Sequence, residues 1–290
     1  WNSEKTEKCR RQRQLKKFEL TQFQKEGIWL TIPTFKPSEE QYEQLQNVLK
    51  QVKNLPPQKY VVFDIRGNGG GNSTYSEMIL ESFFGKEYVE QKICQEDNKV
   101  LWRTSDDNVN YIKSFMERFG VGQIDTSFLT LYLEKVDVTS EMTSCLEKMI
   151  SYEQLLAEIL HSYDAGSRHW LEEGAHKCAE ENIASSALDT KFIIITSEAN
   201  GSSALIFVDS MYLMTPNLVL LGEETSGDTM YTEIRKVPLL SKRGWLVLPI
   251  KQRIHRKRQS NETYKPDIPF EDIHNTEALR AFVREKINTA

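Results

Sequence analysis

The stretch KFIIITSEANGSSALIFVDSMY, residues 191–212, contains the pattern that decides the fold. Its first six residues form a β-branched apolar run, which is typical of a strand buried on both faces. A polar turn with one glycine follows, and the apolar segment over 203–213 predicts a helix. Upstream, KYVVFDI (59–65), RGNGGGN (66–72) and a predicted helix over 73–84 repeat this order. Strand–loop–helix units of this kind predict an α/β domain.

Further elements continue the same alternation. A capping box formed by Ser38 and Gln41 and an apolar stripe predict a helix over 38–55, which Pro56 ends. The other predicted elements are a strand over 27–35, a strand over 217–222, a β pair formed by 230–239 and 244–252, and a helix over 275–287. We expect a charged lead-in or connector over 1–26 and one α/β domain over 27–290, interrupted by a mainly helical insertion at about 86–190.

Composition narrows the class of protein. The chain has 290 residues and a net charge of -5, so no general attraction to nucleic acid is expected. The basic run KQRIHRKRQ (251–259) is interpreted as a solvated edge, because no aromatic residues interleave it. No apolar run approaches the ~20 residues that span a bilayer, so no transmembrane segment is predicted. The four cysteines are far apart, which predicts free thiols and no metal site.

Two loops could carry chemistry. Four of the five residues over 67–71 are glycines, which indicates a left-handed backbone or the close approach of another group to the backbone. Its amides could hold an oxyanion, but a plain turn is also open, and the loop lacks the Gly-Lys-Ser/Thr of a phosphate loop. Ser202 and Ser203 lie at the predicted helix start, where a serine can cap the helix or act as a nucleophile. The residues alone do not choose between these roles.

Four segments together resemble a known family: YVVFDIRGNGGG, SSALIFVDSM, LVLLGEETSGD and YKPDIPF, in this order. They are similar to serine peptidases of the carboxy-terminal-processing, or tail-specific, and tricorn-core type, over about 27–84 and 190–270. The resemblance implies a ClpP/crotonase-like spiral of ββα units, no cofactor, and a peptide or protein substrate. It favours a periplasmic or secreted location over a cytoplasmic one and leaves the oligomeric state open.

The resemblance also implies roles for residues of this chain. Ser203, before Ala204 at the helix start, corresponds to the nucleophile, and Ser202 would shape or cap the turn. The amide of Gly70 would hold the oxyanion together with the amide of Ala204. Gly69 and Gly71 are the alternatives to Gly70.

The general base does not follow the family pattern. One branch of the family has a lysine where this chain has Asp228, and the other has an Asp-Gly-His element before the first core strand, which this chain lacks. We therefore expect a histidine from residues upstream of Trp1, with an inactive chain as the alternative. Glu262 is a further candidate for orienting a catalytic partner, although a plain loop carboxylate is the simpler interpretation. Asp64 and Arg66 are expected to pair with each other.

The leading hypothesis is a serine endopeptidase that forms an acyl-enzyme on Ser203. The alternative is an inactive module of the same fold that binds a peptide or a hydrophobic ligand. A third reading, an acyl-CoA enzyme of crotonase type, rests on the fold alone, and the sequence offers no adenine or pantetheine site for it.

Overall fold

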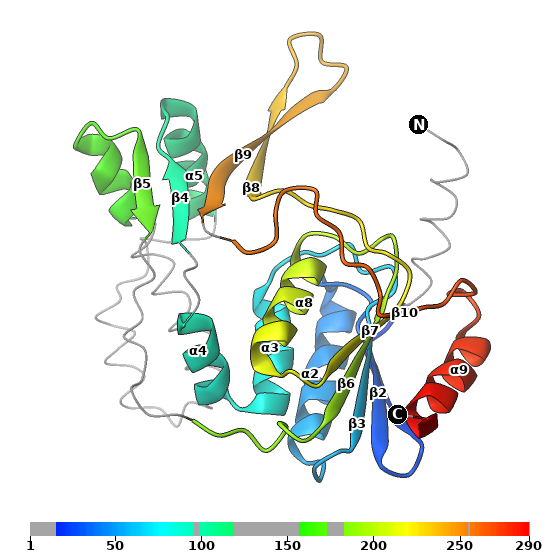
Figure 1. Cartoon of the computed structure of the whole chain (residues 1–290). Helices are drawn as coiled ribbons and strands as arrows, with labels where there is room; N and C mark the ends of the chain where they lie inside the picture. Colours follow the sequence, from blue (N-terminus) through cyan, green and yellow to red (C-terminus); the bar gives the residue numbers. More distant parts are fainter. Residues whose placement is uncertain (1–15, 96–98, 119–156, 173–182, 255, 290) are drawn as a thin grey trace. The chain divides into compact units, whose positions relative to one another are not determined.

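The computed structural model describes residues 16–95, 99–118, 157–172, 183–254 and 256–289 (Figure 1). The chain divides into two compact units. The first comprises Trp1–Glu96, His176–Thr229 and Lys257–Ala290, and the second comprises Asp97–Ala175 and Met230–Arg256. Among the described residues, no helix combines the length and apolar character needed to cross a membrane.

A six-stranded sheet forms the centre of the first unit, in the order β1-β2-β3-β6-β7-β10. β1 is antiparallel to β2, and the other neighbours are parallel. The unit is therefore a mixed α/β structure, as the alternation of strands and helices predicted. The strands are β1 (Glu19–Phe23), β2 (Gly27–Thr31), β3 (Tyr60–Asp64), β6 (Lys191–Thr196), β7 (Leu218–Gly222) and β10 (Ile268–Pro269).

Helices cover both faces of this sheet (Figure 1). Val61, Phe63 and Ile194 belong to the core cluster that includes residues of α2, α3, α4 and α8. The alternate residues Val62 and Ile193 belong to the cluster that includes α9. This alternation follows from the two-residue period of a strand and explains why both strands are apolar throughout. The helices are α2 (Glu39–Lys53), α3 (Thr74–Phe84), α4 (Lys86–Cys94), α8 (Ser203–Met214) and α9 (Thr276–Thr289).

The second unit contains an antiparallel sheet in the order β5-β4-β9-β8. Its strands are β4 (Lys99–Arg103), β5 (His169–Glu172), β8 (Tyr231–Pro238) and β9 (Trp245–Ile254). The helix α5 (Asp106–Arg118) and helical residues 157–164 accompany the sheet. The structure confirms the predicted β pair, because β8 and β9 form a hairpin. The strands β4 and β5 lie inside the segment predicted to be mainly helical, and residues 119–156 of that segment lie outside the described residues.

Two boundaries differ from the prediction. Residues 19–23, expected in the charged lead-in, form β1, because Phe23 is buried against Trp29. The helix α4 belongs to the first unit, so the second unit begins at Asp97 rather than near residue 86.

The prediction of free thiols is wrong for Cys94, which is disulfide-bonded. The other three cysteines, Cys9, Cys145 and Cys178, lie outside the described residues.

Candidate active site

Three loops meet at the carboxyl ends of β3, β6 and β7, which are adjacent parallel strands. They are the glycine loop (66–72), the serine turn (197–202) and the turn at 223–228. The carboxyl ends of parallel strands are where α/β sheets form their ligand crevices. The topology thus gathers segments far apart in the sequence at one edge of the sheet.

The glycine loop lies directly against the serine turn. Gly70 has φ +94°, and a Cβ atom there would lie 2.7 Å from the Gly201 oxygen and 2.8 Å from the Ser203 nitrogen. Gly71 has φ +145°, and its Cβ atom would lie 2.0 Å from the Phe35 oxygen. Only glycine fits these two positions, which explains the composition of the loop.

Two buried asparagines hold the glycine loop and the serine turn together. Asn200 Nδ2 donates hydrogen bonds to the Ile65 oxygen at 2.6 Å and the Asn68 oxygen at 3.0 Å. Its Oδ1 accepts a hydrogen bond from the Ser197 amide at 2.7 Å. Asn68 Oδ1 accepts a hydrogen bond from the Gly70 amide at 2.9 Å. Both side chains are fully buried, so these bonds fix the two loops relative to each other.

The two serines differ in conformation and exposure. Ser203 is 4% exposed, and its Oγ donates a hydrogen bond to the Gly71 oxygen at 2.6 Å. Ser202 is exposed, adopts φ 53° and ψ −126°, and makes no capping hydrogen bond. A non-glycine residue persists in this region of backbone space only where its surroundings impose it, often at functional sites. A strained and exposed serine between a strand and a helix is the arrangement of a nucleophile elbow.

The backbone amides near the two serines differ in whether they are already hydrogen-bonded within the chain. The Ala204 amide donates to the Gly201 oxygen at 3.1 Å, and the Gly70 amide is bonded to Asn68. Both predicted oxyanion donors are therefore occupied. The amides of Ser203 and Gly71 make no hydrogen bond with the described part of the chain.

Gly71, within the glycine loop, pairs with Phe35 in the segment after β2. The neighbouring residues Gly70 and Asn72 make the two backbone hydrogen bonds with Phe35, at 3.2 and 2.7 Å. This pairing leaves the polar groups of Gly71 on the side away from Phe35, where its carbonyl receives the Ser203 hydroxyl.

The turn at 223–228 completes the edge. Ser226 donates to the Asn200 oxygen through its amide at 3.1 Å and its Oγ at 2.5 Å. Asp228, at the position of the lysine in one branch of the family, accepts a hydrogen bond from Arg258 Nη1 at 2.6 Å. Arg258 also contacts Asp209 of α8 at 3.0 Å and is almost fully buried. Asp228 thus belongs to an ion-pair cluster.

Tyr264 extends this cluster. Its Oη donates a hydrogen bond to Asp209 Oδ1 at 2.5 Å. Burial, together with the negative charge of Asp209, raises the pKa of Tyr264 well above its ordinary value.

Other residues singled out in the sequence lie elsewhere or have structural partners. Glu262 is exposed, and its carboxylate accepts a hydrogen bond from the Gln259 amide at 2.6 Å. Asp64 and Arg66 form the expected buried pair, at 2.6 Å. Across the described ranges, no histidine or lysine side chain is hydrogen-bonded to Ser202, and no group of side chains is arranged to hold a metal ion. His176 and His255 lie outside those ranges.

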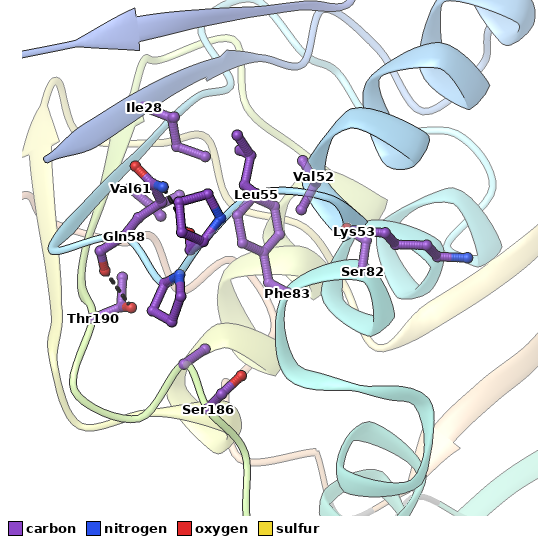
Figure 2. A pocket seen from close by; sticks show the side chains of 13 residues that line it. Ile28, Val52, Lys53, Leu55, Gln58, Val61, Ser82, Phe83, Ser186 and Thr190 are labelled. Carbon is purple, nitrogen blue, oxygen red and sulfur yellow. Dashed lines mark hydrogen bonds between the residues drawn. The ribbon is translucent and has the colours of Figure 1, made fainter.

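A separate pocket of about 160 Å³ lies at the opposite end of the sheet (Figure 2). Ile28 and Val61, near the amino ends of β2 and β3, contribute to its lining. Thr190 Oγ1 donates a hydrogen bond to the Gln58 oxygen at 2.7 Å at its margin. Because it lies at the amino ends of the strands, it is not part of the serine site.

Comparison with known proteins places the chain in a family. The sequence model of peptidase family S41 matches residues 28–270. The chain therefore belongs to peptidase family S41, which is a family of serine peptidases. A comparison with curated protein sequences gave no significant match.

Of three similar solved structures, mature CPAF has a TM-score above 0.5 and agrees in fold. Mature CPAF complexed with lactacystin is 15% identical with a TM-score of 0.53, and the match covers 91% of this chain and 52% of that one. A putative peptidase from Parabacteroides merdae is 14% identical with a TM-score of 0.43, over 88% of this chain and 57% of that one. The photosystem II D1 C-terminal processing protease is 10% identical with a TM-score of 0.37, over 88% and 46%. The chain thus spans about half the length of these proteins.

Proposed function

We propose that the chain is the core of a serine endopeptidase whose nucleophile is Ser202. The observation that carries this assignment is the contrast between the two serines: Ser202 is exposed on a strained turn, whereas the Ser203 hydroxyl is buried and bonded to Gly71. The Ser203 nucleophile expected from the sequence is the competing assignment. Its hydroxyl would have to leave the Gly71 carbonyl before it could attack a substrate. The ClpP/crotonase-like spiral remains a prediction for the fold.

With Ser202 in place of Ser203 as the nucleophile, the proposed oxyanion donors are the amides of Ser203 and Gly71 rather than those of Ala204 and Gly70. Ser202 Oγ attacks the carbonyl carbon of a peptide bond and loses its proton to a general base. The developing oxyanion accepts hydrogen bonds from the amides of Ser203 and Gly71, neither of which is hydrogen-bonded to the described part of the chain. The C–N bond then breaks, the amine leaves with a proton, and water hydrolyses the acyl-enzyme.

The general base stays the predicted histidine from residues upstream of Trp1. Asp228, at the position of the lysine in the other branch, is a carboxylate engaged by Arg258, so it is not proposed for this role. A peptide or protein is the proposed substrate.

Paired serine variants test the proposal. The 290-residue chain and a form extended upstream are treated with a fluorophosphonate probe, and peptide hydrolysis is measured in parallel. We expect labelling of the extended form to disappear in Ser202→Ala and to persist in Ser203→Ala. Labelling that survives Ser202→Ala and is lost in a folded Ser203→Ala would instead support Ser203. No labelling of either form under conditions that label a control peptidase would contradict an active enzyme.

The second candidate function is an inactive module that binds peptides at the same edge. Its support is that Ser202 has no hydrogen-bonded base among the described residues. It predicts saturable peptide binding that Ser202→Ala leaves unchanged, without turnover in the extended form.

A further inference from the structure

The turn of the β8–β9 hairpin carries an unusual set of exposed apolar side chains. Leu240 at the apex is 105% exposed, and Trp245 at the start of β9 is 63% exposed. The turn is closed by backbone hydrogen bonds between Leu239 and Gly244 at 3.0 Å and between Lys242 and Leu239 at 2.8 Å. The apolar side chains are thus presented by an ordered turn.

One face of the hairpin is also exposed over the part nearer the turn. The strands pair in a register that places Ile234 opposite Pro249, Lys236 opposite Val247, and Pro238 opposite Trp245. These pairs are two residues apart, so their side chains share one face. All six residues are exposed, and five of them are apolar.

The rest of the sheet does not support this part of the hairpin. β4 pairs with β9 only over Lys251–Ile254, which leaves the segment nearer the turn two-stranded. Figure 1 shows this segment extending beyond β4. A two-stranded ribbon is marginally stable in water, and an uncovered apolar face on it indicates a surface that another structure covers.

The charge of the hairpin points to what covers it. Residues 231–254 contain six lysines and arginines and one acidic residue, Glu233, a net charge of +5 (6 − 1), although the whole chain carries -5. Lys236, Lys242 and Arg243 near the turn are exposed and form no ion pair with the described part of the chain. Leucine and tryptophan beside free cations are the combination that binds the interface of an anionic bilayer.

We propose that the tip of the β8–β9 hairpin, residues 234–249, is a docking surface for a membrane that contains anionic lipids. Leu239, Leu240 and Trp245 enter the interfacial region, and Lys236, Lys242 and Arg243 lie among the headgroups. The three residue pairs between Lys236–Val247 and the turn span about 10 Å, which matches the depth to which peripheral segments enter a bilayer. The proposal is independent of the peptidase assignment.

Vesicle binding of the 290-residue chain tests this proposal. The chain is sedimented with phosphatidylcholine vesicles and with vesicles that also contain phosphatidylserine. We expect binding only to the anionic vesicles. The triple variant Lys236→Gln/Lys242→Gln/Arg243→Gln should bind about 100-fold more weakly, since each cation near such a surface is worth roughly fivefold. The matched variant Lys25→Gln/Lys50→Gln/Lys113→Gln, which changes three exposed lysines elsewhere, should bind like the wild type.

Brominated lipids report whether the tip enters the bilayer. They should quench part of the tryptophan fluorescence in the wild type, and this part should be missing in Trp245→Phe. Leu240→Ser should weaken binding without changing the melting temperature, because Leu240 is fully exposed.

Three outcomes would overturn the proposal. They are no binding to either vesicle, equal binding by the wild type and the hairpin variants, and a concentration-dependent dimer that Leu240→Ser abolishes in the absence of lipid. The last would assign the surface to a second copy of the chain.

Discussion

Gly70 shows how a single residue determines the site. Its left-handed backbone and its closeness to Ser202 and Ser203 leave no room for a side chain. We expect Gly70→Ala to lower the free energy of unfolding by roughly 1–3 kcal/mol, the cost of a strained backbone position, and to abolish fluorophosphonate labelling of the extended form.

Gly69→Ala is the matched control, because a Cβ atom there would meet only the Ala199 oxygen, at 3.9 Å. It should leave urea unfolding and labelling close to those of the wild type. Equal effects of the two substitutions would contradict the close packing of Gly70 on the serine turn.

Asn200 supports a second prediction at this scale. Asn200→Ala removes the partners of the Asn68 oxygen and the Ser197 amide in a buried setting, and one of the two partners of the Ile65 oxygen, which keeps the Asn68 amide. Because a buried unsatisfied polar group costs roughly 1–3 kcal/mol, we expect the free energy of unfolding to fall by at least about 2 kcal/mol. Asn200→Asp keeps the acceptor for Ser197 but loses the donor, so urea titrations should place it below the wild type. A neutral Asn200→Ala would show that the two loops hold their positions without this side chain.

At the scale of elements, α2 begins at Glu39, directly after the Ser38 cap that the sequence predicts. Ser38 Oγ accepts a hydrogen bond from the Gln41 amide at 3.3 Å, and Gln41 Oε1 accepts one from the Ser38 amide at 3.1 Å. We expect Ser38→Ala to lower the free energy of unfolding by about 1 kcal/mol in urea titrations. Ser38→Asp, which keeps an acceptor, should cost much less. Equal losses for both variants would mean that the capping bond does not contribute.

At the scale of the molecule, Tyr264 and Arg258 connect the segment after β9 to Asp209 on α8. Burial and Asp209 raise the pKa of Tyr264 in the folded chain, whereas an unfolded tyrosine titrates near pH 10. The associated stability is therefore fully present below about pH 10 and is lost as the pH rises toward the folded pKa.

Tyr264→Phe should flatten this alkaline loss of stability. We expect the free energy of unfolding to fall less steeply between about pH 9.5 and 11 than in the wild type, as measured by urea titrations. A residual slope should persist, because burial also raises the pKa values of Tyr88 and Tyr212. Tyr111→Phe, at an exposed tyrosine, is the control. Identical slopes for all three proteins would contradict the role of Tyr264.

The sequence by itself determined the family and most of the elements of the first unit. Apolar runs of period two, an apolar stripe of period 3.6, a capping box and clustered glycines are local signals, so they could be interpreted without a structure. The strands over 191–196 and 218–222 and the helices at 39, 74, 203 and 276 follow from them. β4 and β5 were not predicted because they are short and pair only with segments distant in the sequence: β4 pairs with β5 and with β9.

Only the tertiary structure distinguished the two serines. In sequence, Ser202 and Ser203 are adjacent hydroxyls at a helix start, and either could cap or attack. Folding places the glycine loop against the turn, imposes a left-handed backbone on Ser202 and directs the Ser203 hydroxyl to the carbonyl of Gly71. Contacts between segments about 130 residues apart decide which of the two serines is exposed and leave the amides of Ser203 and Gly71 without a hydrogen bond to the described part of the chain. No local sequence pattern encodes these contacts.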